Sequence, residues 1–373
     1  MVLSTYIIKL GGVFMDGKIK SDYNKDLENT LQLKLRRLIR DLPYHSELFF
    51  RGIEPTTSIK TRIAYAFDLR IFFYFLTNEV KDFQSFLPID ITTDILELIT
   101  PLHIERFLEF LSIYSMPHYE DPSKIIPYSN SNKGKARKLS TLRTFFKYLF
   151  KKGIIKSNPT LLVDMPKVNE KPITKLEVDE VVKLLDLIEN GDNLSKTEKR
   201  YHKYNKNRDL ALLTLLLGTG IRVSECVGLN ISDFDFSING FKITRKGGNQ
   251  VILYFSNEVA EILQTYLDER ISLIPKVGHE DALFLSLQNK RLGVSSIQKI
   301  VKKYTKRVTP LKNISPHKLR STYGTNLYRE TGDIYIVADV LGHKDVNTTK
   351  KHYAAIDDDQ RRKAAQVVKL REE

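Results

Sequence analysis

Residues 210–225, LALLTLLLGTGIRVSE, determine the fold of the second half of this chain. The first eight of them are apolar on every side, which predicts a helix buried in a protein core. The glycine-rich turn at 218–220 ends that helix, and Arg222 follows at the edge of the core. The uncharged run at 210–221 has twelve residues, whereas a helix that crosses a membrane needs about 20. We therefore predict a core helix and no membrane span.

The segment that follows the buried helix predicts a small sheet. Residues 231–255 alternate between apolar and polar side chains, with turn signals at Asn239-Gly240 and Gly247-Gly248. Such a pattern is typical of a three-stranded antiparallel sheet. Helical periodicity returns after the sheet and continues to the end of the chain. The second half is therefore predicted to be an α+β domain.

The limits of this domain are predicted from local signals. Thr174 and Glu177 stand in capping-box register before an apolar helix, so the domain is expected to span 174–373. Residues 190–207 are polar and predict a surface insertion or a mobile loop. Residues 357–370 predict a terminal amphipathic helix.

The first half predicts helices with one apolar face. A helix is predicted behind Pro55, because apolar residues recur there at spacings of three and four, at Ile59, Ile63, Ala66, Leu69, Phe73 and Leu76. Another helix is predicted from Asn132 to Lys152, with Gly153 ending it. We expect an N-terminal extension at 1–50, helical from about residue 24, a helical domain at 51–156 and a proline-marked linker at 157–173.

Composition and charge indicate the class of partner. The chain has 373 residues, a formal net charge of +14 and a pI near 9.4, which favours a polyanion such as nucleic acid. Residues 131–156 hold nine basic residues and no acidic one. A solvated helix face is the alternative, but such faces usually mix both signs of charge. We expect DNA contacts from this segment, at Lys133, Lys135, Arg137, Lys138, Arg143 and Lys147.

Cysteine use and motif content exclude several kinds of chemistry. One cysteine, Cys226, can form neither an internal disulfide nor a thiolate cluster, so a reduced, cytoplasmic location is expected. The sequence contains no metal-site motif and no phosphate-binding loop of the nucleotidase type. We therefore predict no metal and no cofactor.

A set of cations and one phenol in the second half indicates phosphate chemistry. The residues are Arg222, Lys246, His317, Arg320, His343 and Tyr353. His317 and Arg320 are three residues apart and share one helix face. When an oxygen attacks a phosphodiester, negative charge develops on the non-bridging oxygens. Without a metal, guanidinium groups such as those of Arg222 and Arg320 can stabilise that charge. Structural roles remain the alternative for either histidine, and Lys242 or Arg245 could take the place of Lys246.

In order and context these residues resemble the tyrosine recombinase (phage integrase) family, with the Xer-type site-specific recombinases most similar. The resemblance implies a mainly α fold with a small antiparallel β-sheet, in which a helical core-binding domain and an α+β catalytic domain form a C-shaped clamp on DNA. It implies that Tyr353 is the nucleophile and makes a 3′-phosphotyrosyl link. Lys246 would then protonate the leaving oxygen, His317 would manage the tyrosine proton and His343 would bind the phosphate. Glu225 is expected to orient Arg222 through an ion pair.

The resemblance also implies partners and an assembly. The expected substrate is double-stranded DNA at a specific site, bound by a homotetramer on two DNA sites in which the 357–370 helix passes to a neighbouring protomer. A DNA translocase or a second recombinase remains open as a further partner. The expected role is Xer-like chromosome dimer resolution. Integration or excision of a mobile element or phage, relaxation of supercoils alone, and a catalytically idle DNA-binding protein remain alternatives.

Overall fold

The structure, a computed structural model, describes residues 18–169, 174–245, 248–343 and 345–346, except for the side chains of 18–27. The chain divides into two compact units, Met1–Glu170 and Lys171–Glu373. The division falls inside the stretch expected to be a linker. Lys246, Tyr353 and the expected 357–370 helix lie outside the described residues.

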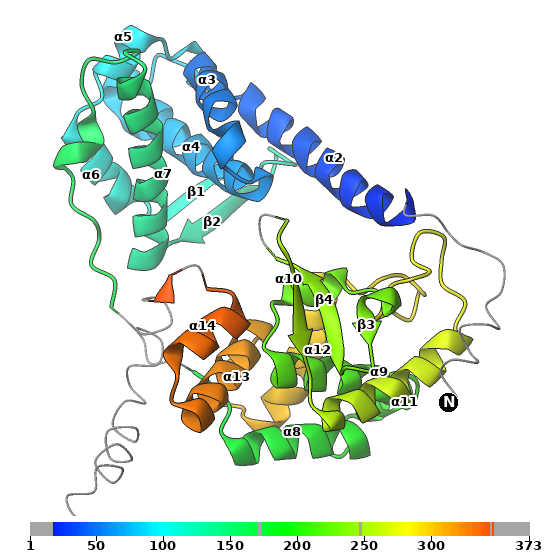
Figure 1. The fold of residues 1–373 in the computed structure, drawn as a ribbon. Helices are drawn as coiled ribbons and strands as arrows, with labels where there is room; N and C mark the ends of the chain where they lie inside the picture. The colour runs from blue at the N-terminus through cyan, green and yellow to red at the C-terminus, as the bar shows by residue number, and fades with distance from the viewer. Residues whose placement is uncertain (1–17, 170–173, 246–247, 344, 347–373) are drawn as a thin grey trace, which may run out of the picture. The chain divides into compact units, whose positions relative to one another are not determined.

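The first unit is built from helices and one hairpin in its described part (Figure 1). Its helices are α2 (Lys18–Arg40), α3 (Tyr44–Ile53), α4 (Ile59–Glu79), α5 (Thr93–Glu97), α6 (Pro101–Phe110) and α7 (Asn132–Lys151), with 3-10 turns η1 (Glu54–Thr56), η2 (Lys81–Phe83), η3 (Pro88–Asp90) and η4 (Pro159–Leu162). Strands β1 (Ile113–Pro117) and β2 (Ile125–Ser129) pair antiparallel. The 132–152 helix is confirmed as α7, and Gly153 follows it with φ +67°.

Helix α4 is the centre of the first unit and contacts α2, α6 and α7. It buries residues beyond the single predicted face, among them Phe72 and Phe75. Phe72 meets Phe107 of α6 edge to face, with ring centroids 5.1 Å apart. Such pairs contribute about 0.5–1.5 kcal/mol beyond the area they bury. The core is therefore held by interlocking aromatic rings.

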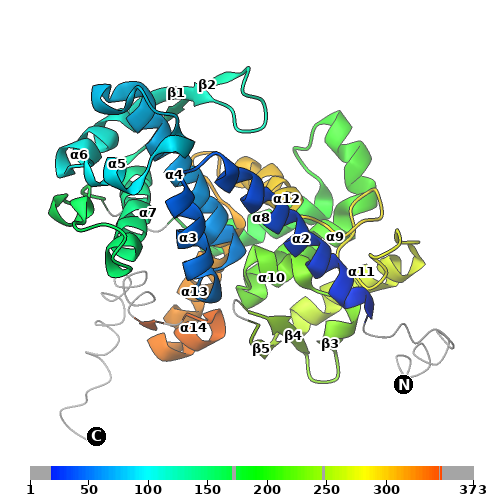
Figure 2. The same ribbon diagram turned by 90° about the horizontal axis from the view of Figure 1, so that it is seen from above.

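Several of the described side chains that precede residue 50 belong to this core. Helix α2 begins at Lys18 and lies alongside α4 (Figure 2). Helix α3 runs through the expected boundary at residue 50 and buries Phe49 and Phe50. The expected boundary at residue 50 is therefore not a boundary for the described residues before it, because apolar residues of α2 and α3 such as Leu35 and Phe49 belong to the same hydrophobic cluster as α4 and α7. The helix expected from about residue 24 is present as α2.

The hairpin β1–β2 was not predicted from the sequence, because proline is uncommon within paired strands. Pro127 pairs with Ser115, and Pro117 with Ile125. In a two-stranded ribbon each strand has a free edge, where the missing N–H of proline costs no ladder hydrogen bond.

The linker is shorter than expected at its N-terminal end. Turn η4 packs against α6 and α7, and both Ile155 and Val163 are buried in the core of the first unit. Residues 157–163 are therefore part of the folded unit.

The second unit contains a helical cluster and a small sheet (Figure 1). Its elements are α8 (Val178–Asn190), α9 (Lys196–Thr219), α10 (Val223–Gly228), η5 (Ile231–Asp233), β3 (Phe234–Asp235), β4 (Gly240–Thr244), β5 (Gln250–Tyr254), α11 (Asn257–Ser272), α12 (Val294–Val308), α13 (Pro316–Thr331) and α14 (Ile334–Leu341). The three strands pair antiparallel in the order β3-β4-β5, so the predicted sheet is confirmed. Of the helices described in either unit, none has the length and apolar character that a bilayer crossing requires.

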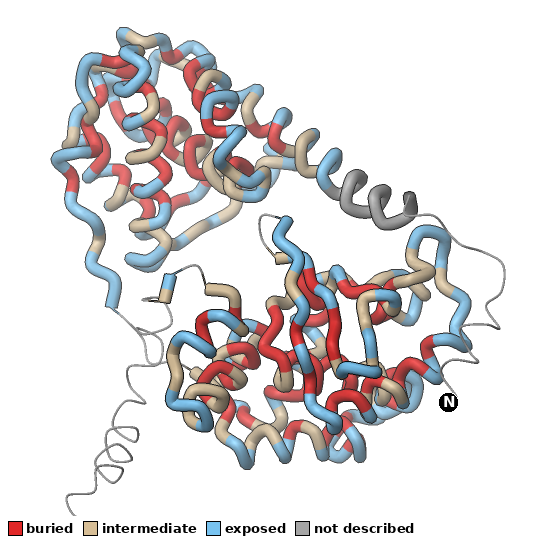
Figure 3. Tube along the Cα trace, in the orientation of Figure 1, coloured by how far each residue is buried: buried red, intermediate tan, exposed pale blue. Residues whose placement is uncertain are grey.

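Helix α9 includes the segment expected to be a loop. Residues 196–207 are helical and continue without a break into the buried segment that begins at Leu210. Ser195 and Glu198 form a capping box at its start, a signal present in the sequence. The residues at the start of α9 are mostly exposed and those at its end are mostly buried, and Figure 3 shows buried residues gathered in the interior of each unit.

A buried polar network holds the first half of α9 against α12. The Asp209 carboxylate is 1% exposed and accepts a hydrogen bond from the Tyr304 hydroxyl at 2.9 Å. His202 Nδ1 lies 3.2 Å from the same hydroxyl. Arg208 and Lys303 form ion pairs with Asp209 at 2.6 and 3.3 Å. A buried carboxylate is stable when its oxygens are paired in this way.

The start of α8 also differs from the prediction. The capping box is formed by Glu177 and Glu180, and α8 begins at Val178. Thr174 lies before the cap. A glutamate oxygen takes the role that was expected of a threonine hydroxyl.

Candidate active site

The end of α9 brings a tight turn to the centre of the second unit. Gly220 ends the helix with φ +61°, a conformation that favours glycine. A Cβ there would lie 2.4 Å from Tyr323 Cδ1. Arg320 of α13 donates from Nη1 to the Gly220 carbonyl at 2.7 Å. Arg320 is 5% exposed, so α13 places a guanidinium group against the turn that precedes Arg222.

Arg222 stands at the N-cap of α10 and is held by Glu225. Its Nη1 donates to Glu225 Oε1 at 2.8 Å, and its backbone N–H donates to Glu225 Oε2 at 2.8 Å. The Glu225 side chain is 5% exposed, whereas that of Arg222 is 35% exposed. The expected ion pair is present, and it leaves one side of the guanidinium open to solvent.

Both arginines meet the C-terminal turn of α14. Arg222 Nη2 donates to the Gly342 carbonyl at 3.0 Å, and Arg320 Nη2 donates to the Leu341 carbonyl. The backbone N–H of His343 donates to Ala338 O at 2.9 Å, which closes the helix end. The structure therefore brings Arg222, Arg320 and the backbone of His343 together, although they are up to 121 positions apart in the sequence.

His317 lies one helical turn before Arg320 on α13 and is exposed. Its carbonyl accepts a hydrogen bond from the Ser321 hydroxyl at 3.1 Å. The shared face predicted for His317 and Arg320 follows from their spacing on this helix. Lys246 and Tyr353, the other two predicted residues, are outside the described part of the chain.

Arg245 also contacts the α14 turn. From the sequence it was considered only as an alternative to Lys246. Its Nη1 donates to Asp339 O at 3.1 Å and its Nη2 to Val340 O at 2.8 Å. Burial lowers the pKa of its guanidinium below the ordinary value. No sequence pattern indicates these contacts, because the acceptors are backbone carbonyls in a distant helix.

Cys226 lies beside Glu225 and is fully buried. Burial raises the pKa of its thiol, which opposes formation of the reactive thiolate. Cys226 is a side chain of the hydrophobic core of the second unit.

The described residues contain no group of three or more His, Cys, Asp or Glu side chains placed to hold a metal ion. The charged groups that gather at the site are guanidinium groups held by backbone carbonyls, and guanidinium groups suit an anion.

Several of the basic residues of α7 are engaged within the first unit. Arg137 donates to both oxygens of the buried Asp68 at 2.6 Å. Lys138 is 7% exposed and its Nζ donates to Asn130 Oδ1 at 2.9 Å; burial lowers its pKa. The prediction that Lys138 contacts DNA is wrong for this structure, because its ammonium group points into the fold.

The remaining basic residues of α7 differ in their partners. Arg143 Nη2 donates to Val163 O at 2.6 Å, and Lys135 Nζ donates to Ser112 Oγ at 2.7 Å. Lys133 and Lys147 are exposed and form no side-chain bond with any residue that the structure describes. These two lysines are therefore exposed members of the predicted DNA-contact set that the described part of the fold does not engage.

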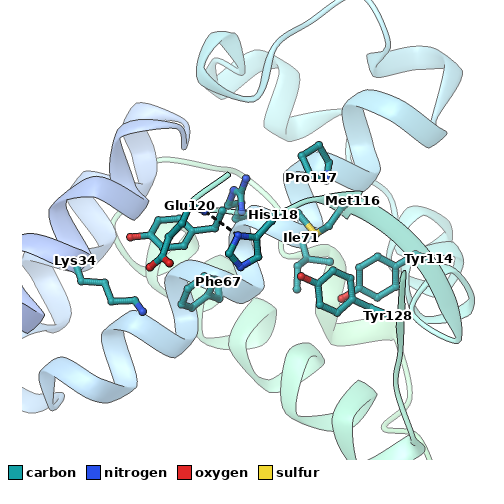
Figure 4. Close-up of a pocket in the computed structure, with 11 residues that line it drawn as sticks. Lys34, Phe67, Ile71, Tyr114, Met116, Pro117, His118, Glu120 and Tyr128 are labelled. Carbon is teal, nitrogen blue, oxygen red and sulfur yellow. Dashed lines mark hydrogen bonds between the residues drawn. The ribbon is translucent and has the colours of Figure 1, made fainter. Parts of the chain in front are cut away.

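A separate cavity of about 310 Å³ lies in the first unit beside the β1–β2 hairpin (Figure 4). The Lys34 ammonium lies 5.5 Å from the centre of the Phe67 ring and 5.6 Å from that of Tyr119. None of the predicted catalytic or DNA-contact residues lines it. This cavity is distinct from the candidate active site.

Comparison with known proteins gives consistent matches. The model of the phage integrase family matches residues 174–360, a range that contains all six predicted catalytic residues. Tyrosine recombinase XerC of Caldanaerobacter subterraneus subsp. tengcongensis is 34% identical over 318 residues, covering 83% of this chain and 82% of the relative. Tyrosine recombinase XerD of Staphylococcus epidermidis is 32% identical over 226 residues, covering 61% of this chain and 73% of the relative.

Solved structures show the same fold at lower identity. XerH recombinase bound to its difH substrate superposes with a TM-score of 0.57 at 20% identity, covering 79% of this chain and 76% of that one. The Tn1549 transposon integrase in complex with circular intermediate DNA gives a TM-score of 0.58 at 18% identity, covering 83% and 95%.

Proposed function

Because this chain belongs to the phage integrase family and is a tyrosine recombinase, we propose that it exchanges DNA strands at a specific site through a Tyr353–DNA link. The observation that supports this most is the meeting of Arg222 and Arg320 at the turn that precedes His343. Two guanidinium groups at one turn can share a single phosphate. Tyr353 lies ten residues after His343 in the sequence.

The arginines stabilise the charge that develops on the phosphate. When an oxygen attacks phosphorus, negative charge builds on the non-bridging oxygens, and fixed donors lower the barrier because they need no reorganisation. Glu225 and the 341–342 carbonyls fix the two guanidinium groups before DNA arrives. Arg222 is the more exposed of the two and can approach the phosphate directly.

The proposed reaction needs no external energy source, because each phosphodiester bond that breaks is replaced by a phosphotyrosyl bond. The Tyr353 oxygen forms a bond to phosphorus, the bond from phosphorus to the 5′ oxygen breaks, and the DNA is left with a 3′-phosphotyrosyl end. His317 receives the phenolic proton and Lys246 supplies a proton to the leaving oxygen. A 5′ hydroxyl from another strand then attacks the phosphotyrosine and releases Tyr353, so the number of phosphodiester bonds is unchanged.

The proposed biological role is Xer-like resolution of chromosome dimers, linked to chromosome partition and cell division. The names of the relatives, XerC and XerD, support this role over integration of a mobile element. We further propose a homotetramer on two DNA sites, in which both units of each protomer contact the same duplex and the 357–370 segment passes to a neighbouring protomer. Two-site recombination by a protein of this kind requires four nucleophiles, which a tetramer provides.

We expect cleavage of a nicked suicide substrate to proceed in EDTA and without nucleotide. Arg222 and Arg320 supply the charge that a metal supplies in other phosphoryl-transfer enzymes. The measurement is the amount of covalent protein–DNA adduct after denaturation, with and without added Mg²⁺. An adduct that forms only with Mg²⁺ would overturn the proposed mechanism, and absence of any adduct would overturn the function.

The exposed lysines of α7 allow a test of DNA binding by the first unit. We expect Lys133→Ala with Lys147→Ala to weaken binding and to flatten the slope of log affinity against log salt by about 0.9 for each phosphate that is no longer neutralised. The measurement is a salt titration of binding to a duplex site. Lys124→Ala is the matched control, because that exposed lysine pairs with Asp121 on the hairpin. An unchanged slope in the double variant would exclude these contacts.

Arg137 is unsuitable for the same test. Its removal would leave the buried Asp68 without its closest cation, and a buried charge without a partner destabilises the folded state. Weaker binding in such a variant would then combine unfolding of the protein with removal of a phosphate ligand.

A further inference from the structure

Arg245 is fixed at both its backbone and its side chain. Its backbone N–H donates to Asn249 O at 2.8 Å, and its carbonyl accepts from Gly248 N–H at 3.1 Å, so it closes the turn between β4 and β5. Its side chain reaches α14 and donates to Asp339 O and Val340 O. Arg245 therefore ties the end of the hairpin to the end of a helix.

The fit between Arg245 and the α14 turn is close. Gly342 has φ +61°, and a Cβ on it would lie 2.1 Å from Arg245 Nη1. Arg245 Nε is buried and has no hydrogen-bond partner among the residues that the structure describes. Burying a charged nitrogen without a hydrogen-bond partner costs free energy. An arginine whose only role was to add surface charge would be expected to keep its guanidinium group in water.

Three arginines from three elements share four successive carbonyls. Arg245 takes those of residues 339 and 340, Arg320 takes that of 341, and Arg222 takes that of 342. These carbonyls form the negative end of the α14 dipole, where cations are stabilised. Arg222 and Arg320 have assigned roles in the proposed reaction, whereas Arg245 has none.

We propose that Arg245 is a positioning residue that fixes the 339–343 turn, and through it the placement of Arg222, Arg320 and His343, without touching DNA. The inference rests on the proposed function. Arg245 immediately precedes Lys246, the proposed general acid, in the chain. The contacts of Arg245 therefore connect the β4–β5 hairpin with the turn that precedes His343.

The test is Arg245→Met, which keeps a long unbranched apolar chain and removes every N–H donor. We expect single-turnover cleavage at saturating DNA to slow by about 100-fold, the cost of a displacement of the order of 1 Å in an active site. Binding affinity and its salt slope should stay at the values of the unchanged protein, because Arg245 makes no phosphate contact. Lys183→Met is the matched control, since Lys183 is an exposed cation on α8 that pairs with Asp179 and its loss should leave the cleavage rate unchanged.

A substrate with sulfur in place of the 5′ leaving oxygen separates this role from proton donation. Sulfur leaves without protonation, so it should rescue Lys246→Ala. It should not rescue Arg245→Met, because the phosphate-binding arginines themselves are displaced. Rescue of Arg245→Met, a flatter salt slope, or a cleavage rate equal to that of the unchanged protein would each overturn the inference.

Arg245→Lys provides the test if the methionine variant is unfolded at the assay temperature, as judged by thermal unfolding. Lysine keeps the charge, but one ammonium group lacks the planar fork that spans two carbonyls. We expect about a tenfold loss of cleavage rate, and a full rate would overturn the inference. If the unchanged protein forms no adduct, or Tyr353→Phe still forms one, the proposed function fails. If the unchanged protein cleaves and the Arg245 variants cleave equally well, only this inference fails.

Discussion

Tyr353→Phe should form no covalent adduct with a nicked suicide substrate while it binds the same DNA with nearly unchanged affinity. The substitution removes one oxygen atom, and in the proposed reaction that atom makes the bond to phosphorus. The basic surfaces that determine affinity are unaffected. The measurements are denaturing electrophoresis for the adduct and a binding titration under the same salt conditions.

The comparison needs a second tyrosine as control. Tyr335 is exposed on α14 and precedes the α14 turn, so Tyr335→Phe should form the adduct at the rate of the unchanged protein. A persistent adduct in Tyr353→Phe would assign the nucleophile to another residue. Loss of the adduct in Tyr335→Phe as well would show that the loss is not specific to Tyr353, and would overturn its assignment as the nucleophile.

Arg222→Lys should lower the single-turnover cleavage rate by about 10²–10³, the cost of losing one preorganised donor to a developing negative charge. Lysine keeps the charge but cannot bond Glu225, the Gly342 carbonyl and a phosphate oxygen in the fixed geometry of a guanidinium fork. The rate should be measured at saturating DNA, because the expected loss is in the chemical step.

Arg200→Lys is the matched control for this substitution. Arg200 is an exposed arginine on the first half of α9, so its replacement should leave the cleavage rate unchanged. Arg222→Lys should bind DNA within a few-fold of the unchanged protein. A cleavage rate equal to that of the control would show that Arg222 does not stabilise the reacting phosphate.

The helices with a clear apolar stripe could be predicted from the sequence, whereas elements with mixed signals could not. Residues 132–152 combine such a stripe with a terminal glycine, and α7 follows them closely. The first half of α9 has no comparable stripe, because its buried residues include polar ones such as His202 and Asn205. Its capping box at Ser195 and Glu198 is the one signal for a helix that the sequence offers there, and tertiary contacts such as those of His202 and Asp209 with Tyr304 hold the segment in place.

Some residues of the site could be predicted from the sequence and others could not, because their partners differ in kind. Arg222, Glu225, His317 and Arg320 lie in short motifs whose spacing on a helix or turn places side chains together. Arg245 bonds backbone carbonyls of a helix 94 and 95 positions away, and carbonyls are present at every residue. A sequence pattern therefore cannot identify its partners. For α7 the sequence predicted too many DNA contacts. Two of its basic residues, Arg137 and Lys138, are bound within the first unit by Asp68 and Asn130.

The α14 turn also determines which mutations the active centre can tolerate. The oxygens that hold the three arginines belong to the main chain, and no change of side chain deletes a carbonyl. Asp339 is exposed and Val340 is half-buried, so both positions can vary in evolution while their oxygens stay in place. Gly342 is the exception, because any larger residue would collide with Arg245. An insertion in this turn, by shifting the backbone, would displace all three guanidinium groups in a single genetic event.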